Sequence, residues 1–354
     1  MSDICRGRVA VVTGAGRGVG RGHALELARQ GACVVVNDLG GSVDGTGADV
    51  GPAKGVVDEI LALGGEAVAN TDEVADWEGA RWLVETAIGA FGRLDVVVNN
   101  AGILRDRMLF NMTEAEWDAV IRVHLKGTFA PTRWAASYWR DEHKAGRPVD
   151  ARVISTSSTS GLFANPGQSN YGAAKSGIAT FSIIAAKELA RYGVTVNAIA
   201  PGARTRMTEH LGGRAAPPPG EWDDRAPENV APLVAWLAGP ASRDVTGQVF
   251  LVGGGRIAVA RGWERGPGVD HGARWEPAAL DDVVPALVSE AGPGGRPEEQ
   301  PQARSAEAGL GGRPEEQPQA RSAEAGPGGR PEEQPQARSA EAGPGGRPER
   351  MTGA

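Results

Sequence analysis

From residue 8 to about residue 252, short apolar runs alternate with longer stretches that mix apolar and polar residues. The short runs are rich in valine and carry few polar residues, which is typical of strands covered on both faces of a sheet. We therefore predict strands at residues 8–12, 32–37, 66–69, 94–98, 152–155, 194–199 and 249–252.

The longer stretches between these runs have the length and mixed polarity of helices. They predict helices at residues 20–30, 77–91, 114–138, 171–191 and 229–237. Regular alternation of strand and helix is typical of a parallel sheet with right-handed crossovers. The expected fold class is α/β, a Rossmann-like doubly wound parallel sheet in a single domain.

The C-terminal end has a different pattern. A 17-residue unit, AGPGGRPEEQPQARSAE, starts at Ala291, recurs at Ala308 and Ala325, and is truncated after Ala342. Because the unit has almost no aliphatic residue larger than alanine, it cannot offset the roughly 1–2 kcal/mol of backbone entropy that each ordered residue loses. We expect a disordered tail.

The predicted organisation thus has three parts, a folded domain, an extension and the repeat tail, at residues 1–265, 266–290 and 291–354. The extension contains Trp275 and the apolar run 283–288, and Trp263 comes just before it. These residues could pack on the domain or on a neighbouring subunit.

Composition narrows the class of protein. The net charge of −7 disfavours a broad nucleic-acid surface. Only two cysteines are present, Cys5 and Cys33, so no disulfide framework is indicated. No apolar run approaches the length of a membrane span or of a secretory signal. We expect a soluble, cytoplasmic protein without a bound metal.

A glycine-rich turn follows the first predicted strand and precedes a predicted helix. Glycines there allow a tight turn and let main-chain amides approach a pyrophosphate at the N-terminus of the helix. The spacing is T-G-x-x-x-G-x-G rather than the common G-x-G-x-x-G. The candidate cofactor-binding residues of this turn are Thr13, Gly14, Gly16, Arg17, Gly18, Val19 and Gly20.

The end of the second strand indicates which dinucleotide binds. Asp38 lies 18 residues after Gly20, close to the expected place of the acid that binds the adenosine ribose. A carboxylate accepts hydrogen bonds from ribose hydroxyls and repels a 2′-phosphate, which favours NAD. The guanidinium of Arg17 could attract that 2′-phosphate and would then favour NADP, or it could be a solvated loop residue. Asp72, after the third strand, is either an adenine ligand or a capping or loop aspartate.

The fourth strand ends in a cluster of small and amide residues at the edge of the sheet where such folds bind ligands. Small side chains there permit close approach to a cofactor, and amides can link neighbouring strand ends. The candidate cofactor-binding residues are Asn99, Ala101 and Gly102.

The candidate catalytic residues are Ser158, Tyr171 and Lys175. Tyr171 and Lys175 are four residues apart and share one face of a helix. An ammonium beside a phenol lowers the phenol's pKa, so that it can exchange a proton near neutral pH. A serine hydroxyl from just upstream can bind a substrate oxygen. By itself the Tyr-x-x-x-Lys spacing is weak, because it also occurs on ordinary half-buried helices.

Taken together, these motifs and the Pro201-Gly202 turn resemble the short-chain dehydrogenase/reductase family over about residues 7–265. In that family the serine lies thirteen residues before the tyrosine, which selects Ser158 over Ser157. The resemblance implies that Pro201, Gly202, Tyr171 and Lys175 also contact NAD. It further implies a homodimer or homotetramer and hydride transfer between a secondary alcohol and the cofactor.

A narrower resemblance is to the (3R)-hydroxyacyl-CoA dehydrogenase domain of peroxisomal multifunctional enzyme type 2 (17β-hydroxysteroid dehydrogenase type 4) and its bacterial relatives. It rests on residues 35–41, 99–107, 123–127, 167–171 and 261–265. It implies oxidation of a (3R)-3-hydroxyacyl-CoA, and a hydroxysteroid or other secondary alcohol is the alternative. A silent nucleotide sensor that acts through the tail is a third hypothesis.

Two local questions stay open at this level. His124 stands where many family members carry a catalytic asparagine, and it could be either a packing residue or a proton shuttle. The region after Gly202, through Thr205, Met207 and the prolines at 217–219, suits a mobile substrate lid. Within it, Arg204 and Arg206 could bind a CoA phosphate or be solvated charges.

Overall fold

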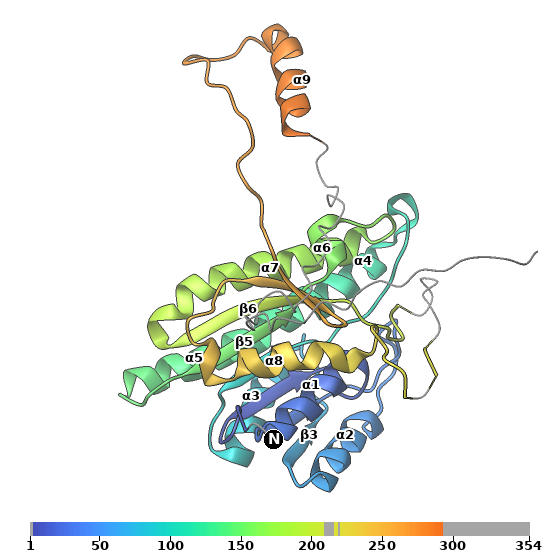
Figure 1. Cartoon of the computed structure of the whole chain (residues 1–354), viewed down its shortest axis with the longest axis vertical. Coiled ribbons are helices and arrows are strands. Elements are labelled where there is room, and N and C mark those ends of the chain that lie inside the picture. Colours follow the sequence, from blue (N-terminus) through green and yellow to red (C-terminus); the bar gives the residue numbers. More distant parts are fainter. Residues whose placement is uncertain (1–2, 209–215, 219, 293–354) are drawn as a thin grey trace, which may run out of the picture. The chain divides into compact units, whose positions relative to one another are not determined.

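The computed structural model describes residues 3–208, 216–218 and 220–292 (Figure 1). Part of the predicted lid, residues 209–215 and 219, lies outside the described residues. So does the predicted repeat tail beyond Gly292.

An eight-stranded sheet forms the centre of the molecule, in the order β3-β2-β1-β4-β5-β6-β7-β8. Strands β1 to β7 pair in parallel, as the valine-rich runs predicted, and β8 pairs antiparallel with β7. The strands are β1 (Val9–Thr13), β2 (Cys33–Asn37), β3 (Glu66–Asn70), β4 (Val96–Asn99), β5 (Ala151–Thr156), β6 (Val194–Pro201), β7 (Val249–Gly253) and β8 (Arg256–Ala260).

Helices cover both faces of this sheet (Figure 1). Successive strand residues alternate between the two faces, so Val12 packs in the core under α1, α2 and α8, whereas Val11 packs in the core under α3, α5 and α7. The helices are α1 (Gly18–Arg29), α2 (Gly51–Ala62), α3 (Trp77–Phe91), α4 (Glu114–Ile121), α5 (Gly127–Lys144), α6 (Thr159–Phe163), α7 (Ser169–Leu189), α8 (Ala231–Ala238) and α9 (Leu280–Ala291).

The strand order reverses between β1 and β4. The chain runs outward from β1 to β2 and β3, then returns to β4 on the other side of β1. Such a reversal leaves a crevice at the carboxyl ends of the two central strands, because the connections leave in opposite directions. The glycine turn after β1 and the segment after β4 therefore meet at one edge.

The single helix predicted over residues 114–138 is interrupted. A π-helical turn, η2 (Arg122–Lys126), lies between α4 and α5, and it buries His124. Because a π turn holds one more residue than an α turn, it shifts which side chains face inward, and such turns are frequent at functional sites. Nothing in the apolar spacing of this stretch signalled the interruption.

Other differences arise outside the parallel core. The sequence prediction omitted α2, α6 and the antiparallel edge strand β8. It also allowed the extension to pack on the domain, but Trp263 is 96% exposed and α9 has no buried residue. Within the described part of this chain that packing is absent, and packing on a neighbouring subunit stays a prediction.

Candidate active site

A cavity of about 610 Å³ opens at the carboxyl edge of the sheet, at the predicted crevice. Most of the predicted site residues line it, although they come from seven separate stretches of the chain. They are Gly14, Arg17, Gly18, Val19, Gly20, Asp38, Asp72, Ala101, Gly102, Ser158, Tyr171, Lys175 and Pro201. Four predicted residues are not part of the lining, namely Thr13, Gly16, Asn99 and Gly202.

The glycine turn packs against the end of β4 so closely that side chains would not fit. A Cβ atom on Gly14, whose φ is +61°, would lie 2.7 Å from the Cα of Ala101. A Cβ atom on Gly20 would lie 2.1 Å from the carbonyl oxygen of Gly14. Glycine is therefore required at both positions to close the turn, and the main chain forms the cavity wall.

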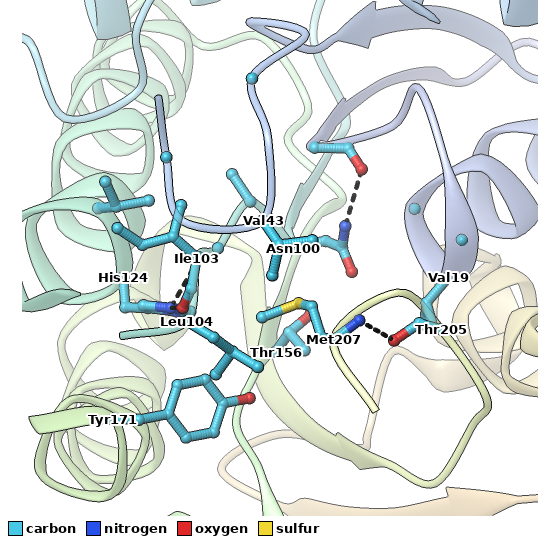
Figure 2. Close-up of a pocket in the computed structure, with 18 of the residues that line it drawn as sticks. Val19, Val43, Asn100, Ile103, Leu104, His124, Thr156, Tyr171, Thr205 and Met207 are labelled. Carbon is cyan, nitrogen blue, oxygen red and sulfur yellow. Dashed lines mark hydrogen bonds between the residues drawn. The ribbon is translucent and has the colours of Figure 1, made fainter. Parts of the chain in front are cut away.

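Thr13 and Asn100 hold the two walls together. The Thr13 hydroxyl accepts hydrogen bonds from the main-chain N–H groups of Asn100 at 2.9 Å and Ala101 at 3.0 Å. In return, the Asn100 amide donates to the carbonyl oxygens of Thr13 and Gly14, both at 3.1 Å. Figure 2 shows one of these two bonds of Asn100. Thr13 is thus a buried link that positions the site from behind.

The asparagine that the sequence selected at the end of β4 faces away from the cavity. Asn99 is 3% exposed, and its amide donates to the Thr132 hydroxyl at 2.9 Å. The neighbouring Asn100, which the sequence prediction left out, lines the cavity. With two asparagines in a row, only the twist at the end of the strand decides which of them faces the ligand.

Asp38 is held in place by main-chain donors on both sides. One carboxylate oxygen accepts from the N–H of Gly16 at 2.8 Å, and the other accepts from the N–H of Gly40 at 2.7 Å. The guanidinium of Arg17 donates to the carbonyl oxygen of Gly41 at 3.3 Å. The orientation of the Asp38 carboxylate is therefore fixed by main-chain donors, and Arg17 is anchored to the loop after β2.

Asp72 lines the cavity in the loop after β3. Its carboxylate accepts from the Asn70 amide at 2.7 Å. Asp76, not Asp72, caps the following helix α3, so the capping interpretation of Asp72 is wrong. Its predicted contact with adenine stays a proposal.

Ser158, Tyr171 and Lys175 converge on the cavity from β5 and α7. Ser158 begins α6, and its hydroxyl accepts from the N–H of Ser160 at 3.2 Å. Figure 2 shows the Tyr171 hydroxyl directed into the cavity. The ammonium of Lys175 lies 5.5 Å from the centre of the Tyr171 ring. Ser157, by contrast, is buried and donates to the carbonyl oxygen of Lys175, so Ser158 is the one of these two neighbours that lines the cavity.

Burial sets the protonation of this group. It raises the pKa of Tyr171 above its ordinary value, and a side-chain hydrogen bond with Ser158 opposes the rise. Burial also lowers the pKa of Lys175 to about 7, and its ammonium donates to the carbonyl oxygen of Thr156 at 2.6 Å. The expected lowering of the Tyr171 pKa by Lys175 is therefore wrong for the protein without cofactor, because loss of hydration outweighs it.

His124 lies against Tyr171. The two ring centres are 5.1 Å apart, with an angle of 90° between the ring planes. Burial and the nearby Lys175 lower the pKa of His124 to about 3, so its ring is neutral at physiological pH. A neutral ring with so low a pKa is a poor general acid, which weighs against proton shuttling by this residue.

A loop after β2 also lines the cavity, and the sequence prediction gave it no role. Residues 39–49 extend beyond Asp38, and the Val43 carbonyl oxygen accepts from the N–H of Leu104 at 2.9 Å. Arg105 donates from Nε to the carbonyl oxygen of Asp44 at 2.9 Å. The loop thus joins the Asp38 end of the cavity to the segment after β4. The length of this loop is unusual for a connection between a strand and a helix. That length was the signal in the sequence that could have identified the loop as part of the site.

The two arginines proposed for a CoA phosphate differ in their surroundings. Arg204 forms an ion pair with Asp223, and Arg206 lines the cavity. No ion pair of Arg206 occurs among the residues that the structure describes. Of the two, only Arg206 is placed to meet a ligand.

Comparison with known proteins agrees with this geometry. The family model for short chain dehydrogenases matches residues 8–214. Hydroxyacyl-CoA dehydrogenase ChsB1 of Mycobacterium tuberculosis is 48% identical over 284 residues, which cover 77% of this chain and 86% of the relative. The crystal structure of a short chain dehydrogenase from Mycobacterium avium is 56% identical, covers 82% of this chain and 97% of its own, and superposes with a TM-score of 0.74.

The chain belongs to the short-chain dehydrogenase/reductase family, and it is an oxidoreductase that acts on CH–OH groups. It is also 44% identical over 277 residues to peroxisomal multifunctional enzyme type 2 of Mus musculus. That match covers 78% of this chain but only 36% of the mouse protein.

Among residues 3–208, 216–218 and 220–292, no helix has the length and apolar character needed to cross a membrane. The same residues contain no group of three or more side chains suited to hold a metal ion.

Proposed function

We propose that this chain is an NAD-linked dehydrogenase that interconverts a (3R)-3-hydroxyacyl-CoA and a 3-ketoacyl-CoA. The observation that carries the proposal is the shared cavity, in which Ser158, Tyr171 and Lys175 lie with the glycine turn and Asp38. The acyl-CoA substrate is suggested by the relative named a hydroxyacyl-CoA dehydrogenase, which matches along most of both chains.

The residues present fit a dinucleotide. The glycine turn is a cradle without side chains, since a Cβ atom on Gly14 or Gly20 would strike main-chain atoms. It leads directly into the N-terminus of α1, whose free N–H groups favour a pyrophosphate. Asp38 would hold the adenosine ribose and disfavour a 2′-phosphate, which supports NAD over NADP. Asp72 would meet the adenine.

The proposed chemistry divides between the cofactor and the chain. A bound nicotinamide supplies the site that accepts or returns hydride. Tyr171 exchanges the proton of the substrate oxygen, donating it to a ketone or removing it from an alcohol. Ser158 binds the same oxygen and stabilises the charge that develops on it. Lys175, when protonated, stabilises the phenolate that Tyr171 forms when it donates.

The raised pKa of Tyr171 has a consequence for direction. In the protein without cofactor the phenol stays protonated at neutral pH, as a proton donor to a ketone requires. Alcohol oxidation needs the phenolate instead, so it should accelerate as the pH rises.

Arg206, which also lines the cavity, would bind an anionic group of the substrate, such as a phosphate of CoA.

The test is a turnover assay over a panel of (3R)- and (3S)-3-hydroxyacyl-CoAs and hydroxysteroids, with NAD and NADP in parallel. We expect kcat/KM to be highest for a (3R)-3-hydroxyacyl-CoA with NAD. Tyr171→Phe should lower kcat by about 10²–10⁴-fold, the usual contribution of a positioned acid or base, while NADH still binds.

Tyr192→Phe, a change at a partly exposed tyrosine outside the cavity, is the matched control and should keep wild-type turnover. Comparable kcat/KM with NADP would contradict the cofactor assignment. Preference for a hydroxysteroid would contradict the substrate, and full turnover by Tyr171→Phe would contradict the catalytic site.

A further inference from the structure

We propose that His124 is a positioning residue, whose ring fixes the orientation of Tyr171 by packing edge-on against it while its own position is set by the main chain after β4. The inference deepens the proposed function and rests on it, since it assigns the residue that keeps the proton-exchanging phenol in place.

The main chain of Ile103 anchors one edge of the His124 ring. Nε2 of His124 lies 3.0 Å from the N–H nitrogen of Ile103 and 2.7 Å from its carbonyl oxygen (Figure 2). Either tautomer meets one of these groups, because Nε2–H donates to the oxygen and bare Nε2 accepts from the N–H. The ring is therefore tied to a fixed stretch of backbone in both forms.

Gly102 confines the same ring from another side. A Cβ atom on Gly102 would lie 2.3 Å from Cε1 of His124 and 3.0 Å from Nδ1. The ring thus fills the space that any other residue at position 102 would need. His124 is 1% exposed, so solvent does not compete for this place.

The opposite side of the His124 ring meets Tyr171. The perpendicular arrangement at 5.1 Å is a favoured geometry for aromatic pairs. The Tyr171 ring is thus confined by the ring of His124 and by the ammonium of Lys175. The ammonium lies 5.5 Å from the centre of the Tyr171 ring. Tilting of the phenol toward His124 is blocked, and this leaves its hydroxyl directed into the cavity.

The π turn explains how His124 reaches this place. Residues Arg122–Lys126 form the wider turn, and His124 is the residue that it buries. A π turn is a less favourable conformation than the α-helix on both sides of it, so its retention at this position is consistent with a function for the inward-facing side chain.

Two variants separate the ring from its anchor. His124→Phe keeps an aromatic ring beside Tyr171 but cannot bond Ile103. His124→Gln removes the ring, while its side-chain amide can both donate to and accept from Ile103. If the ring positions Tyr171, His124→Gln lowers kcat about tenfold or more with less than twofold change in NADH Kd, and His124→Phe stays within about threefold of wild type in kcat.

The matched controls are the same two substitutions at His143. That residue also meets a tyrosine edge-on, since its ring centre lies 5.6 Å from that of Tyr192 with an angle of 79°. The pair lies outside the cavity, so His143→Phe and His143→Gln should leave kcat unchanged. Any loss seen only at His124 then reflects the site rather than the general loss of a histidine.

A second readout does not depend on turnover. The chain has three tyrosines, so ultraviolet titration of each protein with and without Tyr171→Phe isolates the phenol of Tyr171. Water that replaces the ring in His124→Gln should lower the midpoint of that titration toward the ordinary pKa. His124→Phe should leave the midpoint within about 0.3 of wild type, because the phenol stays covered.

The outcomes are distinct. Equal loss of kcat in His124→Phe and His124→Gln would overturn the proposal, because it would show that the imidazole proton or the bonds to Ile103, and not a ring beside Tyr171, are what turnover requires. Wild-type kcat and titration in His124→Gln would show that the ring has no positioning role. Absence of turnover by the wild type on every substrate would instead sink the proposed function, while the titration would still decide the packing of His124 on Tyr171.

Discussion

Lys175 is 3% exposed, and its ammonium has a main-chain carbonyl oxygen, that of Thr156, as its hydrogen-bond partner. Removing an ammonium from water disfavours the charged form, and burial accordingly lowers the Lys175 pKa from 10.5 to about 7. The folded protein thus sacrifices stability to keep a titratable amine beside Tyr171. Function and stability make opposite demands on this residue.

Lys175→Met should therefore raise stability while it abolishes turnover. One pKa unit corresponds to about 1.4 kcal/mol, so we expect a gain of roughly 1–4 kcal/mol in the free energy of unfolding below pH 7. Between about pH 7 and 10.5, Lys175 is protonated in the unfolded chain but neutral in the folded chain. The wild type therefore becomes more stable as the pH rises through this range, and the stability advantage of Lys175→Met shrinks.

Denaturant melts of the two proteins at pH 6 and pH 9 measure this difference. Lys187→Met, on the same helix α7 but outside the cavity, is the control for a lysine-to-methionine change. A Lys175→Met protein less stable than wild type at pH 6 would show that the buried amine stabilises the fold.

At the scale of single residues, the sequence identified the types of side chain that form the cavity. Where two adjacent residues were of the same type, it did not always identify which of the two lines the cavity. Spacing within the family selected Ser158, and the structure places its neighbour Ser157 in the core, bonded to the main chain. Of the two asparagines at the end of β4, the sequence selected Asn99, and Asn100 is the one that lines the cavity. Side-chain direction at a strand end depends on local twist, which spacing does not encode.

Among the elements, the loop of residues 39–49 has the most specific construction. Gly40 has φ of +78°, and a Cβ atom there would lie 1.8 Å from the carbonyl oxygen of Asp49, where the two ends of the loop meet. The N–H of Gly40 also donates to Asp38. The closure of the loop and the orientation of the Asp38 carboxylate, which is proposed to bind the ribose, therefore depend on the same glycine.

We expect Gly40→Ala to weaken NADH binding about tenfold, because the added methyl forces the loop ends apart and moves Asp38. Gly47→Ala is a matched control, since Gly47 also has φ of +78° but no atom lies within 4 Å of its Cβ position. It carries only the roughly 1–2 kcal/mol of left-handed backbone strain and should change the Kd less than threefold. Fluorescence titration with NADH measures both, and equal effects would mean that backbone strain alone matters.

The elements themselves were predicted unevenly. The seven parallel strands appear close to their expected bounds, because most of them are buried on both faces and are therefore apolar at nearly every position. The π turn within residues 114–138 escaped prediction, since it brings His124 against Gly102 and Tyr171, and contacts between distant segments leave no signal in apolar spacing. The antiparallel strand β8 also escaped prediction, since it lies at the edge of the sheet and has no buried residue.

For the molecule as a whole, buried histidines set the response to acid. His23 is fully buried in α1, and burial lowers its pKa to about 3, as it does for His124. The unfolded chain protonates these residues near pH 6.5, the ordinary value, while the folded chain keeps them neutral. The unfolded state then binds more protons, so the protein loses stability as the pH falls from about 6.5 toward 3.

His23→Leu should remove one of these two contributions. At pH 5 we expect the free energy of unfolding to exceed that of wild type by about 2 kcal/mol, and the gain should be smaller at pH 7.5. Denaturant melts at both pH values measure it, and His143→Leu at an exposed position is the control. A gain of the same size at both pH values would show that packing, and not protonation, accounts for the change.

The sequence by itself determined the doubly wound α/β sheet, the glycine turn and the set of residues that could carry the chemistry. These follow from periodicity and spacing, which express interactions between near neighbours along the chain. The tertiary structure decided which of those residues share a cavity, that Thr13 and Asn99 support it from behind, and that the Tyr171 pKa is raised. It also decided that His124 is neutral and lies against Tyr171. These properties depend on burial and on contacts between distant segments, where a side chain's surroundings and not its position in the sequence set its charge and direction.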